Sequence, residues 1–438
     1  MAQHYAEAGL VEKSVTYWGK AGRRAAARSA MAEAAAQFQK GLDQLALLPD
    51  TRARQRQELE FHIALGAVLK AIKGSTALEN ARARALWEQL GSPLEYVGVP
   101  YGQSLYHVYR GELDLALRLD EDLLRLSRQR NDSSGLVMAH YSSGRNLAFA
   151  GRFAASRKHL EEALALYDPS SHRPLVHEIG THPHVDAQSH LGIVLFCLGY
   201  PDQALARSNA AIAEARRLAH PPSLAASLAP GTRLLSLYRD NVVLGEWVDQ
   251  LAAVATEQGF PFWRAVATIF RGWVTVKKGD VFGGISLLRS GSAAYRATGA
   301  ETQTPYHIAL LAEACDIAGH IEEALTLLDE ALQIVGGTGE RWFAAELHRH
   351  KGQLLLRQGH PEAAEELYRK ALSIAREQEA KPWELRAAAS LARLRRDQGR
   401  RAEARDLLAP VYGWFTEGFD TPDLKEAKAL LDELNQQD

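Results

Sequence analysis

The residues best suited to chemistry in this sequence are histidines gathered in SHRPLVHEIGTHPHVDAQSH, residues 171–190. They are His172, His177, His182, His184 and His190. Imidazole binds zinc, and His177-Glu178 followed by His182 nearly matches the H-E-x-x-H spacing of zinc hydrolases, with one residue too many. Histidines five apart on a helix diverge by roughly 140°, and Gly180 and Pro183 would interrupt that helix. A polar loop is therefore the favoured interpretation, with metal binding as an alternative and a metal-dependent hydrolase as a remote one.

Other catalytic arrangements are missing from the sequence. No G-x-S-x-G element is present to expose a nucleophilic serine. Cys197 and Cys315 stand in apolar stretches, where burial makes a thiol unreactive. Adjacent carboxylates such as Glu322 and Glu323 point about 100° apart on a helix, so they solvate a surface and do not form an acid–base pair. We therefore expect no catalytic residue, no cofactor and no metal site, which predicts a protein that is not an enzyme.

The composition of the chain excludes several functions. Its 438 residues are 46% hydrophobic and rich in helix formers, without the alternation of strands, which predicts an all-α fold. Basic residues number 51 and acidic residues 53, so the net charge of -2 gives no field that would attract nucleic acid or anionic lipid. No apolar run reaches the ~18 residues of a membrane span, and two isolated cysteines suit a reducing compartment. We expect a cytoplasmic protein without nucleic-acid or membrane partners.

An internal period reveals the elements that must position any site. Turns recur at steps of 40 residues, with one step of 48 at the histidine-rich insertion. The turn positions are Gly111, Gly151, Gly199, Arg239, Gly279, Gly319, Gly359 and Gly399. Seven residues before each turn stands a small residue, namely Ser104, Gly144, Gly192, Thr232, Gly272, Ala312, Gly352 and Ala392. Small residues at helical spacing let two helices approach closely, so the sequence predicts antiparallel helix pairs joined at these turns.

The best copy of this pattern resembles the tetratricopeptide repeat. Its small residue is Gly352, its turn is Gly359, and Ala364, Tyr368 and Ala371 follow on the second helix. The resemblance implies a right-handed α-solenoid, although the period of 40 exceeds the usual ~34. Several copies depart at the first alanine position, which holds Ser156, Leu244 and Gly284. We expect irregular helical pairs in residues 1–94, the repeat array in residues 95–412, and a capping helix in residues 413–438.

Several longer phrases together resemble the C-terminal region of bacterial multidomain regulators. They are AGLVEKSVTYWGKAG, LGYPDQALARS, TGERWFAAELHRHKGQLLL and WFTEGFDTPDLKEAKALLDEL. In that family a class III nucleotide cyclase domain and a signal-transduction ATPase precede the repeats. This sequence contains no G-x-x-x-x-G-K-[ST] phosphate loop and no segment like the cyclase core. The resemblance thus implies the sensing and docking part of such a regulator, as a fragment or as a free-standing scaffold.

The resemblance also suggests where a partner would bind. In tetratricopeptide arrays the first helix of each pair lines the concave groove, so the position after the small residue and the position four before it should form one stripe. The stripe mixes Arg, Tyr, Trp and Gln, types that anchor peptides and small molecules. The candidate residues are Tyr101, Tyr141, Arg145, Arg233, Trp273, Glu313, Arg349 and Gln353. We expect alanine at Arg145 or Arg233 to weaken partner binding without unfolding the chain.

These observations favour a non-enzymatic repeat scaffold that binds a protein or peptide, or a regulatory small-molecule effector. The alternative is a free-standing small-molecule sensor that reports through oligomerisation. The sequence leaves the identity of the ligand and the oligomeric state open.

Overall fold

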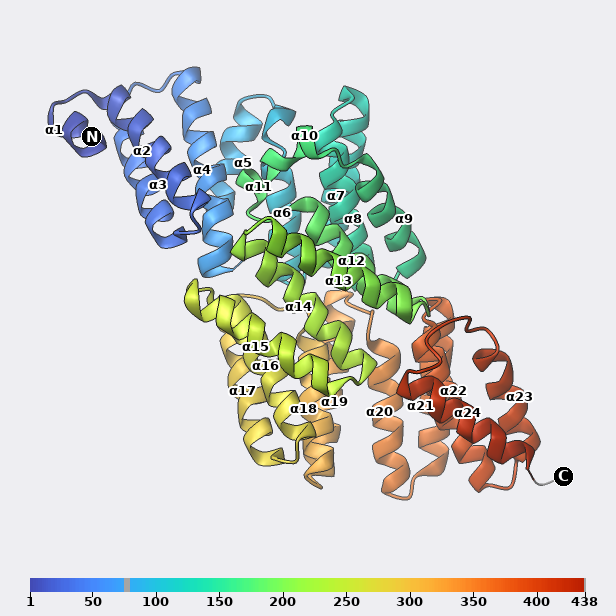
Figure 1. Cartoon of the computed structure of the whole chain (residues 1–438). Coiled ribbons are helices and arrows are strands. Elements are labelled where there is room, and N and C mark those ends of the chain that lie inside the picture. The colour runs from blue at the N-terminus through green and yellow to red at the C-terminus, as the bar shows by residue number, and fades with distance from the viewer. Residues whose placement is uncertain (75–78, 437–438) are drawn as a thin grey trace.

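Helices joined by short turns make up residues 1–74 and 79–436, the part of the chain that the computed structural model describes, and no strand occurs among them (Figure 1). The chain begins with α1 (Ala2–Glu7), α2 (Val11–Ala27), α3 (Met31–Leu45), α4 (Arg52–Lys73), α5 (Glu79–Gln89) and the 3-10 helix η1 (Leu94–Tyr96). Helix pairs follow up to Tyr412. The all-α solenoid predicted from the sequence is therefore confirmed.

Each pair consists of a first and a second helix. The first helices are α6 (Gly98–Tyr109), α8 (Ser133–Phe149), α12 (Pro183–Cys197), α14 (Pro221–Tyr238), α16 (Pro261–Lys277), α18 (Thr304–Ile317), α20 (Ala344–Arg357) and α22 (Lys381–Asp397). The second helices are α7 (Leu113–Arg130), α9 (Phe153–Leu166), α13 (Pro201–Arg217), α15 (Asn241–Glu257), α17 (Val281–Ala297), α19 (Ile321–Thr338), α21 (Pro361–Glu377) and α23 (Arg401–Tyr412). The insertion forms α10 (Pro169–His172), η2 (Arg173–Leu175) and α11 (Val176–Ile179), and α24 (Pro422–Asn435) ends the array.

Local sequence explains where these helices begin and end. All seven predicted turn glycines have positive φ, between 73° and 103°, which glycine adopts without steric cost. Arg239, which stands in place of the turn glycine in one repeat, takes the same left-handed conformation, with φ of 65°. Several second helices begin with proline in their first turn, as at Pro361, or with an aspartate cap, as at Asp280, whose carboxylate accepts the Gly283 N–H at 3.0 Å.

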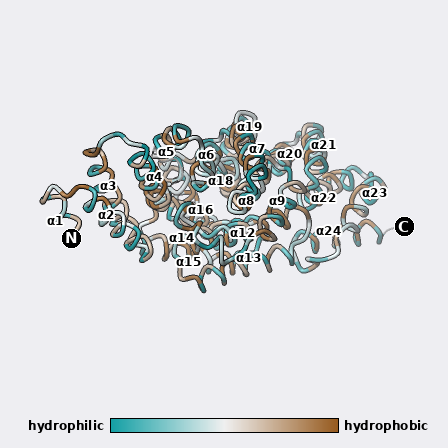
Figure 2. Tube along the Cα trace, turned by 90° about the horizontal axis from the view of Figure 1, so that it is seen from above, coloured by the Kyte–Doolittle hydropathy of each residue, from teal (hydrophilic) through white to brown (hydrophobic). Residues whose placement is uncertain are grey.

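Small residues bring the helices of a pair together. A Cβ added to Gly272 of α16 would lie 2.9 Å from the carbonyl oxygen of Gly284 on α17, closer than real Cβ contacts come. Gly284 replaces the usual alanine of this repeat position, so the departure in sequence gives a closer approach of the two helices. One apolar cluster runs from Val15 to Trp383 and a second from Ala371 to Leu434, and Figure 2 shows hydrophobic and hydrophilic residues alternating along the helices.

The array winds tightly enough that distant repeats touch. The N–H of Glu301 donates to the carbonyl of Tyr109 (2.7 Å), and the N–H of Arg341 donates to that of Phe149 (2.9 Å). The Thr302 hydroxyl also donates to a carbonyl 194 residues earlier in the chain. In Figure 1, α12–α14 lie between the N-terminal helices and α15–α24. The concave faces of early and late repeats therefore have different surroundings.

Candidate functional site: a groove lined by first helices

A groove of about 500 Å³ lies where the first helices of the later pairs converge with α24. Helices α14, α16, α18, α20 and α22 contribute one side chain after another, and α24 completes the wall. The polar and aromatic side chains that line this C-terminal groove include Arg239, Trp273, Lys277, Glu313, Glu346, Arg349, His350, Gln353, Arg386, Arg393, Asp423 and Glu426. Both acidic and basic side chains line the groove, and most of the basic side chains already lie beside an acidic side chain.

Half of the predicted stripe lines this groove. Trp273, Glu313 and Gln353 each follow the small residue of a first helix, and Arg349 stands one helical turn before Gln353. Because the repeats share a 40-residue period, equal positions on successive helices present themselves to one concave face. Gln353 is exposed, Glu313 is half-buried, and the Lys277 ammonium lies 4.1 Å from the ring centre of Trp273. Trp273 and Arg349 are only 4% and 9% exposed, so a ligand in the groove would first meet Gln353 and Glu313.

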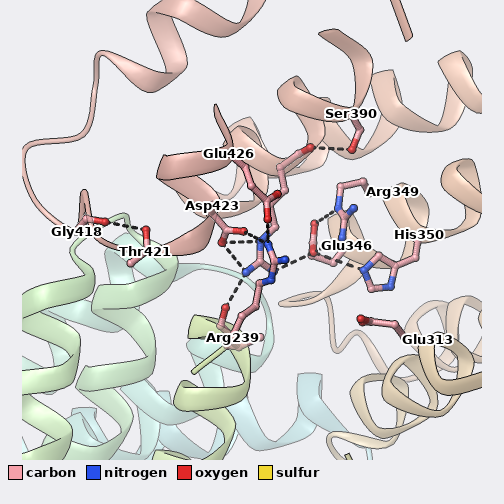
Figure 3. Close-up of polar contacts among 12 residues, drawn as sticks. Arg239, Glu313, Glu346, Arg349, His350, Ser390, Gly418, Thr421, Asp423 and Glu426 are labelled. Carbon is pink, nitrogen blue, oxygen red and sulfur yellow. Dashed lines mark hydrogen bonds and ion pairs between the residues drawn. The ribbon is translucent and has the colours of Figure 1, made fainter. Parts of the chain in front are cut away.

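A buried ion-pair network forms one end of the groove (Figure 3). The Glu346 side chain is only 1% exposed and accepts from Arg349 Nε at 2.6 Å and from Arg386 at 3.1 Å. Burial raises the pKa of Glu346, but the two guanidinium groups outweigh it and lower that pKa to about 2. The carboxylate is thus ionised in the folded protein and can hold both arginines in fixed orientations.

The same network joins the two ends of the C-terminal half. Arg386 donates to the Asp423 carboxylate of α24 at 2.7 Å and to the carbonyl of Leu237 in α14 at 2.7 Å. Arg239, just after α14, pairs with Asp423 at 3.3 Å and with Glu426 at 2.7 Å, as Figure 3 shows. These contacts therefore link α14 to α24 across the groove. The first helices and α24 form the walls of the groove.

The other half of the predicted stripe is buried elsewhere, so the expectation of one continuous stripe is wrong. Tyr101 and Tyr141 are 2% and 3% exposed, and Arg145 and Arg233 are 1% and 5% exposed. We call these four residues the N-terminal interior. The tight winding explains the difference, because later helices cover this face: His190 of α12, for example, packs edge to face against Tyr141 with ring centres 5.7 Å apart.

Within the N-terminal interior, arginines lie against aromatic rings. The Arg145 guanidinium lies 5.6 Å from the ring centres of both Tyr101 and Tyr141, and its Nε donates to the Asn146 side-chain oxygen at 2.9 Å. Arg233 lies over Phe149 and Trp342 in the same way, at 5.9 and 5.6 Å. Hydrogen bonds and cation–π contacts together stabilise the Arg145 cation, whereas Arg233 has the cation–π contacts and a buried Nε with no hydrogen-bond partner among the described residues. These arginines hold helices together and have no route to a partner in the groove.

Sequence reasoning missed the most buried ionic part of the groove. Glu346 and Arg386 stand seven residues before Gln353 and Arg393, and Tyr306 stands seven before Glu313. Seven residues are two helical turns, so this column continues the same helix face. The periodicity could have identified it. The contribution of Arg239 and Asp423 could not be found in this way, because it depends on two repeats meeting in space.

The histidine-rich segment is not a polar loop, and that expectation is wrong. It forms α10, η2, α11 and the start of α12, with His172 and His182 only 2% and 6% exposed. His172 Nδ1 accepts the Asp168 N–H at 2.9 Å, His184 Nδ1 lies 2.8 Å from Glu214, and His190 Nδ1 donates to the Asp186 carbonyl at 2.9 Å. These three rings thus each have a protein partner. Within residues 1–74 and 79–436 no three His, Cys, Asp or Glu side chains are grouped to hold a metal ion.

Both cysteines lie in first helices and are fully buried as free thiols. Burial raises the pKa of Cys315 to about 11 and raises that of Cys197 further. Neither thiol is a nucleophile at neutral pH. None of the helices in the described ranges combines the length and the apolar character that crossing a membrane requires.

Comparison with known proteins supports the repeat architecture. The family model for the tetratricopeptide repeat matches residues 301–377 and residues 343–409. An uncharacterized protein of Rhizobium meliloti (strain 1021) is 27% identical over 371 residues, which are 82% of this chain and 35% of the relative. The chain therefore spans about a third of the length of the curated relative it matches.

Two solved structures share the fold. A Rap protein complexed with competence and sporulation factor aligns with a TM-score of 0.59 at 14% identity, covering 84% of this chain and 98% of that one. The anaphase-promoting complex hetero-tetramer Cut9-Hcn1 aligns with a TM-score of 0.51 at 13% identity, covering 99% of this chain and 75% of that one. The class of protein is thus an α-solenoid of tetratricopeptide-like helix pairs, with the repeat signature in its C-terminal part.

Proposed function

We propose that this chain is a non-enzymatic scaffold that binds a peptide or a peptide segment of a protein in the C-terminal groove. The observation that carries the proposal is the convergence of Trp273, Glu313, Arg349 and Gln353 around one open space of about 500 Å³. Aromatic and charged side chains fixed by buried ion pairs offer rigid anchors for side chains and backbone of a ligand. The Rap protein, whose structure contains a bound factor, has the same fold, which supports a binding role.

The groove also suits a small molecule, which is the second candidate. Small-molecule sites have volumes of ~300–1,000 Å³, and this groove lies within that range. In either case we propose a cytoplasmic regulatory module of a larger signalling protein of the cyclase and ATPase type. The length of the Rhizobium meliloti relative, of which this chain spans 35%, supports a larger context.

A peptide selection tests the binding site. Peptides selected from a random library on the full chain are measured by calorimetry against Gln353→Trp. This substitution fills the groove at an exposed position whose side chain forms no hydrogen bond with another described residue. We expect the affinity to fall at least tenfold. The matched control is Lys370→Trp, an exposed residue of α21 outside the groove, which should bind as the parent does. Failure to select any peptide, or equal binding by both variants, would reject the proposal.

A further inference from the structure

A second cavity, of about 470 Å³, lies between the N-terminal helices and the histidine-rich insertion. One wall comes from α2, α3 and α4, the opposite wall from α10, η2 and α11, and the third from the turn between α13 and α14. No other repeat has such an insertion, because the 48-residue step occurs once in the array. The repeat fold itself does not require this segment, yet the segment is folded and packed.

The insertion is held on α4 by specific contacts. Lys70 Nζ donates to the carbonyl of Ile179 and to the Thr181 hydroxyl, both at 3.1 Å. Gly180 has φ of 79°, and a Cβ there would lie 2.6 Å from the carbonyl oxygen of Ala67. Only glycine allows this approach. The cavity therefore has two walls fixed relative to each other before any ligand arrives.

The lining of this cavity is apolar at its base and cationic at its edge. Met31, Phe38 and Val68 are buried and line the base, with half-buried Val176 and Leu218 beside them. Arg23 and Arg173 are its charged lining residues, and both are exposed. Neither forms a hydrogen bond or ion pair with a residue of the described ranges, and the lining within those ranges includes no Asp or Glu.

Two of the three histidines of the lining, His182 and His220, add little charge at neutral pH. Their rings pack edge to face with centres 5.3 Å apart, and burial lowers the pKa of each to about 4. His220 Nδ1 is held by the Ser223 hydroxyl at 2.8 Å. The guanidinium groups of Arg23 and Arg173 therefore supply the permanent positive charge of the lining.

We propose that this cavity binds a fatty acid, with the hydrocarbon chain along the apolar base and the carboxylate at Arg23 and Arg173. An aliphatic chain removes the apolar base from water, and a carboxylate is the planar group that a guanidinium binds with two parallel hydrogen bonds. The volume lies in the range of small-molecule sites. This site is separate from the C-terminal groove and its occupancy does not depend on a partner there.

Titration calorimetry of the full chain with laurate, below its micelle concentration, tests this assignment. We expect saturable binding, and roughly tenfold weaker binding for Arg23→Gln and for Arg173→Gln, because each loses a hydrogen bond to a charged group. Arg24→Gln, on the same helix but outside the lining, should bind as the parent does. Dodecanol has the same chain without the charge and should bind at least tenfold more weakly than laurate.

A second pair of variants tests the apolar part. Ala27→Trp fills the cavity from an exposed lining position, and Ala36→Trp places the same side chain on α3 outside the lining. Only the first should abolish laurate binding, with the circular dichroism of both unchanged. The proposal is overturned if laurate does not bind, if both arginine variants bind as the parent does, if dodecanol binds equally well, or if Ala27→Trp retains binding while folded.

Discussion

The N-terminal interior and the C-terminal groove differ in whether solvent reaches the same position of the repeat. Arg145 of the N-terminal interior, directly after the small residue of α8, is 1% exposed, and Ile193 at the same position of α12 is 6% exposed. Gln353, at the same position of α20, is exposed to solvent. The local sequence settings are alike, since all three residues follow a glycine on a first helix. The position within the repeat thus determines which side chains face the concave side of the array. The winding of the array determines whether that side is open to solvent.

Two buried glutamates of the array have pKa values shifted in opposite directions. Burial raises the pKa of Glu340, beside the contact between Arg341 and Phe149, to about 7, although N–H groups of Gln303 and Trp342 donate to its carboxylate. Glu346 of the groove has its pKa lowered to about 2 because Arg349 and Arg386 outweigh burial. Burial thus disfavours the charged form of Glu340, which forms no ion pair with a described residue, whereas two arginines keep Glu346 ionised.

The largest effect is expected from Arg145→Ala in the N-terminal interior. The substitution removes hydrogen bonds and two cation–π contacts, and it leaves the buried Asp120 carboxylate without its nearby cation. We expect a loss of ~3–5 kcal/mol in the free energy of unfolding, measured with urea. This replaces the expectation from sequence that the variant would weaken binding alone.

Arg369→Ala is the control for this substitution. Its side chain is 59% exposed and pairs with Glu365 along α21, so the loss should stay within ~0.5 kcal/mol. Equal losses for the two arginines would show that the N-terminal interior is open to water.

A smaller effect should follow from Arg386→Gln at the end of the groove. The substitution leaves Glu346 with one of its two arginines and removes the link from α22 to Asp423 and Leu237. We expect ~2–4 kcal/mol of destabilisation and faster hydrogen exchange in α24. Arg393→Gln removes one long contact of 3.6 Å from a side chain 39% exposed, so it should change stability by less than ~0.5 kcal/mol. Unchanged exchange in α24 after Arg386→Gln would contradict the proposed link.

The smallest of the three effects depends on pH. Because the folded pKa of Glu340 lies above its unfolded value of 4.5, the folded state binds the extra proton and stability falls as pH rises from 4.5 through 7. Glu340→Gln removes this titration. The parent should therefore lose ~2–3 kcal/mol relative to the variant between pH 5 and pH 8, by urea unfolding at each pH. A difference that is constant with pH would contradict the raised pKa.

Glu346 should behave in the opposite direction. Its lowered pKa stabilises the fold above pH 4.5, and this contribution is lost as pH falls toward 2. Comparing Glu346→Gln with Glu340→Gln across acid and neutral pH therefore distinguishes the two glutamates by the sign of the pH dependence of stability.

Much of the fold could be predicted from the sequence because it depends on local features. Turn glycines such as Gly359 and small residues such as Gly352 determine helix ends and helix contacts within about 40 residues. The site was predicted only in part. Gln353 and Arg145 have equivalent sequence positions, and no local feature shows that the winding of the array buries Arg145 and leaves Gln353 exposed. The fold of the insertion was missed for the same reason, since Gly180 approaches Ala67 and Lys70 binds Ile179 across more than a hundred residues.

Thiol labelling tests most directly whether the same repeat position is open to solvent in α20 and closed in α12. Cys197 and Cys315 are buried and have raised pKa values, so an introduced cysteine reports alone. Under native conditions Gln353→Cys should react with a maleimide nearly as fast as a free thiol, and Ile193→Cys should react at least a hundredfold more slowly until the chain is unfolded. Equal native labelling rates at the two positions would contradict the account.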